Sequence, residues 1–208
     1  MVRFPPFLPS AKWYAEWLRA MMSGLECKDA FALANKFTSS EGKALARCLI
    51  AGRDSSPAFM GMAIEGGASV LKNRSRRCDA VKLSDHGNWR HTHIGTLEAT
   101  YGRTPYFSHL MPAIRDCYLT QQSDRLEDFN LSLHNVILEF LGINRFLETY
   151  AYGAGHAQGI QFYATAIERG EEVAASINPE LSIVDATMRA GQEILLALIY
   201  EINNRQPV

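Results

Sequence analysis

Residues 88–107, NWRHTHIGTLEATYGRTPYF, place a histidine in the middle of an apolar stripe. Four residues recur at steps of four: Trp89, His93, Leu97 and Tyr101. Residues at that spacing lie one above another on an α-helix. At the mouth of a cleft, His93 would act as a general acid or base, because imidazole titrates near neutral pH. The alternative is a buried, neutral His93 that is hydrogen-bonded at both nitrogens, to Thr96 or to a backbone carbonyl.

A second candidate for chemistry is Cys48, which lies in the apolar run KALARCLIA. Acyl transfer needs a nucleophile, and a cysteine thiolate forms readily beside a cation or an imidazolium. Arg47 precedes Cys48 but points to the opposite face if this run is a strand. A Cys48–His93 pair would therefore depend on the fold. The alternative is a core cysteine that packs as a small apolar residue.

Basic residues suggest a place for an anionic substrate. The stretch KNRSRR, residues 72–77, contains Arg74 and Arg77, and arginine binds phosphate and carboxylate groups through paired hydrogen bonds. We expect Arg90 and Tyr101 to shape the same pocket from the helix that carries His93. The alternative for residues 72–77 is a solvated loop.

A glycine-rich stretch, YAYGAGHAQG at 150–159, offers a further binding element. Gly153 and Gly155 begin a G-x-G-x-x-x-G spacing ahead of an expected helix, and His156 lies beside them. Such a loop can direct backbone N–H groups at a phosphate or carbonyl group. The alternative is a turn whose glycines adopt positive φ. Residues 144–151 fit a preceding strand, but too few residues follow for the second half of a dinucleotide-binding fold.

A metal site is not expected. His91 and His93 are two residues apart, so on a helix their side chains diverge by about 200°. Cysteines 27, 48, 78 and 117 form no C-x-x-C pair, which argues against a zinc site or a disulfide framework. The sequence indicates no particular cofactor, and we expect a cytoplasmic protein with free thiols.

Composition narrows the classes of partner. The chain has 208 residues, 47% of them hydrophobic, with 21 basic and 22 acidic side chains. This balance disfavours a generic nucleic-acid binder, which would carry an excess of basic residues. No stretch of the sequence approaches the ~20 consecutive apolar residues that a membrane-spanning helix needs. We expect one domain over residues 1–208 that binds a small, anionic molecule.

Short apolar runs dominate residues 1–87, after a helix at 9–23 for which Ser10 is the expected N-cap. We expect four short strands in an antiparallel meander, at 31–37, 44–51, 58–64 and 80–83.

From residue 88 onward the pattern is helical. We expect helices from Asn88 to Arg103, from Ser108, from Asp124 to Gly142, from 160 to 169 and from Ser182 with a break at Gly191. Strands first and helices after predict the α+β class, with a strand-rich part at 1–87 and a helical part at 88–208.

Residues 79–107 resemble the signature of the WbqC-like protein family. The matching features are Trp89, His93, Thr96-Leu97, Tyr101, Thr104 and Pro105-Tyr106-Phe107. LPSAKWYAEWL at 8–18 is similar to the family's N-terminal helix entry, and PELSIVDATMRAGQE at 179–193 is similar to its closing segment. One departure is the stretch KALARCLIA, which keeps only Arg47 and Cys48 of a basic stretch that ends Arg-Asn-Arg-Cys in many members.

The resemblance implies a role alongside surface-polysaccharide or O-antigen genes, with acyl or aminoacyl (glycine-type) transfer suggested for some members. We therefore expect a transferase acting on a sugar nucleotide or a carrier-linked small molecule, with His93 moving a proton and Cys48 as the candidate nucleophile. One alternative is a non-catalytic binding or assembly protein whose helical half forms a homodimer surface. Another is a nucleotide-dependent enzyme, which depends on the glycine-rich stretch.

Overall fold

The computed structural model describes residues 5–23, 45–52, 56–67, 69–72, 81–153 and 168–204. Its elements in chain order are α1 (Ala11–Met22), β1 (Arg47–Ala51), β2 (Pro57–Gly61), the 3-10 turn η1 (Val70–Lys72), α4 (Trp89–Tyr101), α5 (Phe107–Thr120), α6 (Leu126–Leu141), α7 (Ile143–Gly153), α9 (Ile183–Ala190), the 3-10 turn η3 (Gly191–Glu193) and α10 (Ile194–Asn204). The described chain is mainly helical with a small antiparallel sheet, so the predicted α+β class is confirmed.

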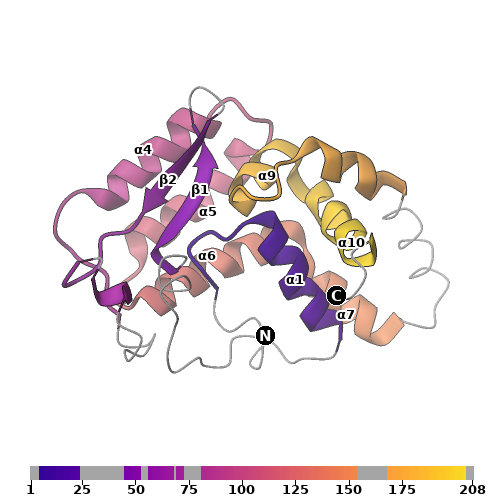
Figure 1. Ribbon diagram of the computed structural model, residues 1–208, viewed down its shortest axis with the longest axis horizontal. Helices are drawn as coiled ribbons and strands as arrows, with labels where there is room; N and C mark the ends of the chain where they lie inside the picture. The colour runs from indigo at the N-terminus through magenta and orange to yellow at the C-terminus, as the bar shows by residue number, and fades with distance from the viewer. Residues whose placement is uncertain are drawn as a thin grey trace.

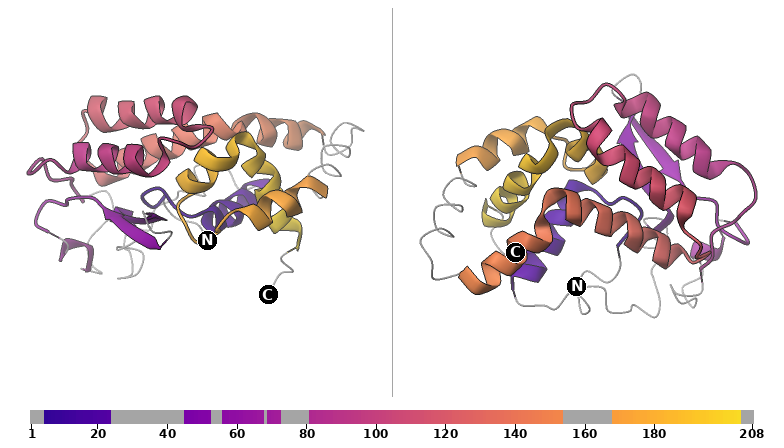
Figure 2. Two further views of the ribbon diagram at one scale, coloured as in Figure 1. Left: turned by 90° about the horizontal axis from the view of Figure 1, so that it is seen from above. Right: turned by 180° about the vertical axis from the view of Figure 1, so that it is seen from behind.

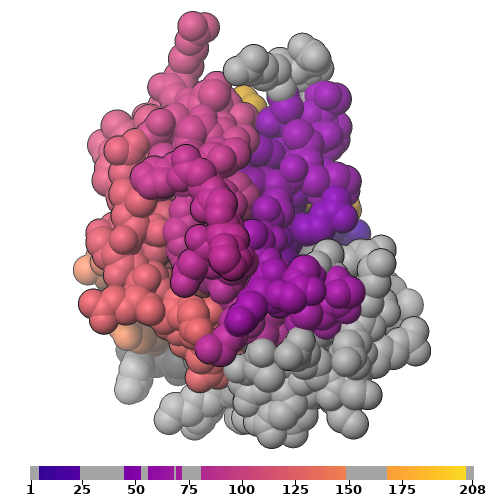
Figure 3. Space-filling model, turned by 90° about the vertical axis from the view of Figure 1, so that its left-hand side faces the viewer, coloured from indigo at the N-terminus to yellow at the C-terminus, as the bar shows by residue number. Residues whose placement is uncertain are grey.

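The helices form two groups, α4 with α5 and α6, and α1 with α7 and α10, and α9 contacts members of both (Figure 1). The β1–β2 hairpin lies in front of α4 and α5, and Figure 2 shows these layers from above. On the other side α1 packs against α7 and α10. Figure 3 shows the hairpin and α4 next to each other on one face of the molecule. Since α9 contacts α1, α5, α10 and β1, it joins the C-terminal segment to both groups.

The hairpin confirms two of the expected strands. Cys48 pairs with Met60, and Ile50 pairs with Ala58. The segment expected as a strand at 80–83 forms only isolated bridges, so that expectation was wrong for residues 81–83. The reason is that its backbone bonds the entry to α6, where the N–H of Leu83 donates to the Asp124 carbonyl at 2.6 Å. The strand expected at 31–37 lies outside the described residues.

Capping residues set several helix ends as expected. The Ser10 hydroxyl accepts from the N–H of Trp13 at 3.3 Å, and Gly142 ends α6 with a φ of 67°. Ser182 caps α9 through the N–H of Val184, and Gly191 interrupts the last helix at a φ of 61°. These predictions are confirmed, because local side-chain chemistry and glycine's access to positive φ decide them.

Other predicted boundaries were wrong. Ser108 lies inside α5, whose N-cap position is taken by Tyr106, and Asp124 lies two residues before the first residue of α6. The start expected at Asn88 was right, because Asn88 is the N-cap residue of α4, although its side chain makes no capping hydrogen bond. Residues 144–151 form part of helix α7 and not a strand, which fits the helical spacing of Ile143, Phe146 and Leu147. Of the helix expected at 160–169, only residues 168 and 169 are described, and they are helical.

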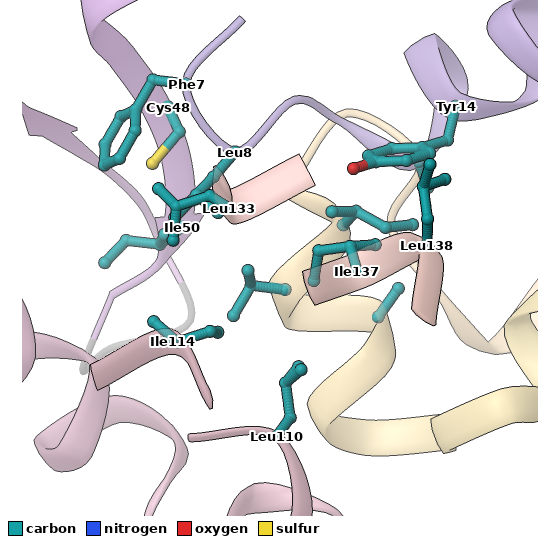
Figure 4. Packing of buried hydrophobic residues seen from close by; sticks show 14 of the residues in the cluster. Phe7, Leu8, Tyr14, Cys48, Ile50, Leu110, Ile114, Leu133, Ile137 and Leu138 are labelled. Atoms are coloured by element: carbon teal, nitrogen blue, oxygen red, sulfur yellow. The ribbon is translucent and has the colours of Figure 1, made fainter. Parts of the chain in front are cut away.

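The core runs continuously from the N-terminal segment through the hairpin to the last helix. Figure 4 shows part of it, with Phe7 and Cys48 at one end and Tyr14 at the other. Asn130 of α6 ties two separate segments into this core, because its side-chain amide donates to the carbonyls of Pro5 and Leu45 at 3.1 and 2.8 Å. The segment before α1 is thereby fixed beside the start of β1.

Candidate functional site

His93 lies inside the protein, with 5% of its surface exposed. Its Nε2 donates to the carbonyl oxygen of Gly61 at 3.0 Å, because a carbonyl can only accept. Nδ1 therefore accepts from the hydroxyl of Tyr118 at 3.3 Å. Burial lowers the pKa of His93 to about 4. The ring is therefore neutral at pH 7, and both its nitrogens are hydrogen-bonded. Thr96 is not one of the partners, because its hydroxyl donates to the Thr92 carbonyl.

Aromatic rings enclose the His93 imidazole. Phe7 stacks on it at 5.7 Å between ring centroids, and Trp89 and Tyr118 present their edges at 5.2 and 5.8 Å. Phe7 comes from the segment that precedes α1. The N-terminal segment, α4 and α5 thus meet at this one side chain.

Cys48 is also buried, with 6% of its surface exposed, and burial raises the pKa of its thiol. Figure 4 shows its side chain beside Phe7. Its strand partner Met60 precedes Gly61, the residue whose carbonyl accepts from His93. The hairpin therefore brings the Cys48 and His93 segments together. Arg47 is exposed where Cys48 is buried, as the alternation along a strand predicts.

Arg90 and Tyr101 make structural contacts from the two ends of α4. Nη1 of Arg90 donates to the Tyr118 carbonyl at 3.3 Å, and its guanidinium lies 4.6 Å over the Trp89 ring. The Tyr101 hydroxyl accepts from the N–H of Ala51 at 3.3 Å. Burial, with the nearby Asp185 carboxylate, raises the pKa of Tyr101.

Asp185 connects α9 to this arrangement. Its side chain is 5% exposed and accepts from Nε of Arg189, four residues later on the same helix, at 3.1 Å. Because Asp185 also lies at the Tyr101 hydroxyl, it links α9 to α4 and, through Ala51, to the end of β1.

An open groove of about 530 Å³ lies between the N-terminal segment, the start of β1 and the turn before α9. Cys48 is the one predicted site residue among those that line it. The others are Pro6, Phe7, Leu8, Pro9, Ser10, Trp13, Arg47, Leu49, Phe59, Glu180 and Ser182. We call this feature the Cys48 groove. His93 lies behind it, since Phe7 both lines the groove and stacks on the imidazole.

Sequence reasoning missed most of the Cys48 groove. Ser10 and Ser182 form an antiparallel bridge there, although 172 positions separate them in the sequence. The three prolines before Ser10 and the turn residues before Ser182 are visible signals of loops, but such signals do not indicate which loops meet in the fold. The groove therefore becomes visible only in the folded structure, where these distant segments come together.

The other predicted site residues were Arg74, Arg77, Gly155 and His156, and they lie outside the described residues. Gly153 is the last residue of α7. Within the described ranges, no group of three or more His, Cys, Asp or Glu side chains is arranged to hold a metal ion. No helix in that part of the chain is long and apolar enough to cross a membrane.

The family model of the WbqC-like protein family matches residues 25–158. The matched range contains the whole signature segment 79–107, with His93, and also Cys48. The similar segments at 8–18 and 179–193 lie outside that range. No curated protein and no solved structure matches the chain. The matched range covers more than half of the sequence, and the chain therefore belongs to the WbqC-like protein family.

Proposed function

We propose that this protein is a transferase of surface-polysaccharide or related biosynthesis. It moves an acyl or aminoacyl group onto a sugar nucleotide or a carrier-linked small molecule that binds in the Cys48 groove. Membership of the WbqC-like family supports the biosynthetic setting, because the family is loosely linked to polysaccharide and O-antigen genes. The observation that carries the proposal is the groove itself, which has a cysteine among its lining residues.

The groove has the dimensions of a substrate site. Its volume of about 530 Å³ lies within the range of roughly 300–1,000 Å³ that small-molecule sites occupy. Its lining combines apolar rings with a few polar groups, among them Arg47, Ser10 and Ser182. Such a lining holds a ligand by its apolar surface and orients it by its polar groups.

Cys48 is the nucleophile in this proposal. Its sulfur bonds to the acyl carbon, and the thiol proton leaves with the departing group of the donor. An amine or hydroxyl of the acceptor then attacks the thioester and releases the sulfur as a thiol. Because burial raises the pKa of Cys48, the bound substrate or a rearranged His93 must help to remove the thiol proton. Phe7 stacks on the His93 ring and also lines the groove, so it contacts both the imidazole and the proposed substrate site.

Mass spectrometry of reaction mixtures tests the proposal. Purified protein is incubated with nucleotide sugars, and the acyl donor is either acetyl-coenzyme A or glycine with ATP. We expect an acylated sugar nucleotide from one combination, and loss of the product in Cys48→Ser but not in Cys117→Ser. Cys117 is a half-buried cysteine of α5 outside the groove, so its variant controls for loss of a thiol. Absence of product from every combination would reject the transferase, and an unchanged rate in Cys48→Ser would reject the nucleophile.

A non-catalytic binding or assembly protein is the second candidate. The burial of both His93 and Cys48 favours it, since neither group carries a charge at pH 7 when its pKa is shifted in these directions. This candidate predicts sugar-nucleotide binding without turnover. Transfer of any group in the same mixtures would exclude it.

A further inference from the structure

The Cys48 groove has an electrostatic character of its own, and two helix N-termini contribute to it. Ser10 caps the 12-residue helix α1 and Ser182 caps the 8-residue helix α9. The two caps are bridge partners, and both line the groove. A helix N-terminus carries about half a positive elementary charge. Both positive ends are therefore directed at one place.

The backbone donors of these two helix ends are already engaged. The N–H groups of Ala11 and Lys12 donate to the carbonyls of Leu181 and Pro179, and the N–H of Ile183 donates to the Pro9 carbonyl. The helix ends therefore add a positive field to the groove, while a ligand needs a donor from elsewhere.

Arg47 provides that donor. Its guanidinium lies 4.3 Å over the Phe59 ring, and no carboxylate of the described residues forms an ion pair with it. The carboxylate that lines the groove, Glu180, is already bonded to Lys12 at 3.0 Å. Within the described residues, the groove thus keeps one cation that no acidic side chain neutralises. An anionic group of a ligand would neutralise the Arg47 guanidinium and accept its hydrogen bonds.

The remaining lining suits a ring. Phe59 is 69% exposed although it is a large apolar side chain, and Trp13 is half-buried. Aromatic faces of this kind pack against flat apolar surfaces such as a nucleobase or the C–H face of a sugar. A ligand with an anionic group next to a ring satisfies both features.

We infer that the Cys48 groove binds a phosphate ester of a sugar or nucleoside, with the phosphate at Arg47 and the ring against Phe59 and Trp13. This inference rests on the proposed function, because it names the substrate class of the same groove. Glu180 lowers the affinity for an anion, because its negative charge lies in the groove lining. Its ion pair with Lys12 offsets part of that charge.

Titration calorimetry on the full chain tests the inference with four probes: uridine diphosphate N-acetylglucosamine, uridine monophosphate, N-acetylglucosamine and inorganic phosphate. We expect the first to bind most tightly and N-acetylglucosamine to bind weakest, since it lacks phosphate. The uridine monophosphate arm shows whether the nucleoside or the sugar occupies the aromatic wall. Equal affinity for N-acetylglucosamine and its nucleotide form, or no binding of any probe, would overturn the inference.

Two charge variants change the affinity in opposite directions. Arg47→Gln should weaken binding of the sugar nucleotide by about tenfold or more, because it removes a charge-assisted hydrogen bond. Glu180→Gln should strengthen binding by roughly two- to threefold, because it removes a negative charge from the groove lining. The expected effect is small because Lys12 and Glu180 are both exposed, so solvent screens their charges. Arg103→Gln, an exposed arginine outside the groove lining, is the matched control and should bind like the unaltered protein. Melting temperatures of all three variants check that each remains folded.

The two proposals fail separately. Binding that depends on Arg47 but yields no transfer product rejects the transferase and keeps the phosphate site. Transfer whose KM for the sugar nucleotide is unchanged in Arg47→Gln rejects the phosphate site and keeps the transferase.

Discussion

Gly191 and Tyr106 lie so close together that a Cβ atom on Gly191 would stand 2.4 Å from Cε1 of the tyrosine ring. The N–H of Tyr106 also donates to the carbonyl of Met188, one turn before Gly191, at 3.1 Å. Tyr106 belongs to the Pro-Tyr-Phe end of the signature segment, and Gly191 belongs to the closing segment. These two parts of the sequence are thus one packing unit in the fold.

Gly191→Ala should destabilise the protein by roughly 3 kcal/mol or more. The residue has φ 61° and ψ −137°, a backbone region that is almost restricted to glycine, and the added methyl group would overlap the Tyr106 ring. Gly142→Ala is the matched control, because Gly142 also has positive φ but no atom within 4 Å of an added Cβ. That control should lose only about 1–2 kcal/mol. Urea unfolding measures both, and equal losses would contradict the contact.

His93→Ala should cost about 2–4 kcal/mol of unfolding free energy, since it leaves the Gly61 carbonyl and the Tyr118 hydroxyl without their partner and opens a cavity. Tyr118→Phe should cost about 1 kcal/mol, because it removes a single hydroxyl. If His93→Ala is as stable as the unaltered protein, the two hydrogen bonds do not hold α4 to β2 and α5.

Stability should fall as the pH drops from 6.5 toward 4. Burial lowers the pKa of His93 to about 4 and that of His134 to about 3, from an ordinary value near 6.5. Between these values the unfolded chain binds more protons than the folded one, so the unfolding free energy rises with pH. His93 alone accounts for roughly 3 kcal/mol of loss at pH values below its folded pKa. Denaturation at a series of pH values measures the slope, and His93→Gln should make it shallower. A slope unaltered in that variant would contradict the lowered pKa.

Thiol labelling should modify Cys117 faster than Cys48. Cys48 is buried and Cys117 is half-buried, and burial raises the pKa of both thiols, with the larger shift at Cys48. Brief exposure of the native protein to a maleimide, followed by digestion and mass spectrometry, reports each site. Faster labelling of Cys48 would show that the thiol is exposed in solution, contrary to its packing beside Phe7.

Local features of the fold were predictable from the sequence. Ser10, Gly142, Ser182 and Gly191 set helix ends through their own hydrogen bonds or φ angles, so one short window contains the information. The errors at Ser108 and at residues 81–83 arose where distant backbone groups decide the outcome. Residues 81–83 had the composition of a strand, but the Leu83 N–H and the Val81 carbonyl bond to the entry of α6, while the Lys82 carbonyl accepts from the N–H of Glu65.

The candidate site was less predictable. The position of His93 on a buried stripe of α4 was readable from its spacing, and so was the opposite orientation of Arg47 and Cys48 along β1. The groove could not be predicted from the sequence, because its walls come from four separate segments that meet only in the fold. These are residues 6–13, 47–49, 59 and 180–182. Arg47 was predicted to contribute little to Cys48, and its guanidinium instead lies over Phe59 at the groove.

A crystal structure of the protein with uridine diphosphate N-acetylglucosamine tests the Cys48 groove most directly. We expect the ligand between Phe59 and Ser182, with a phosphate oxygen about 3 Å from the Arg47 guanidinium. A sugar nucleotide bound elsewhere, for example against Arg74, Arg77 and the stretch 153–159, with the groove holding only solvent, would contradict this expectation.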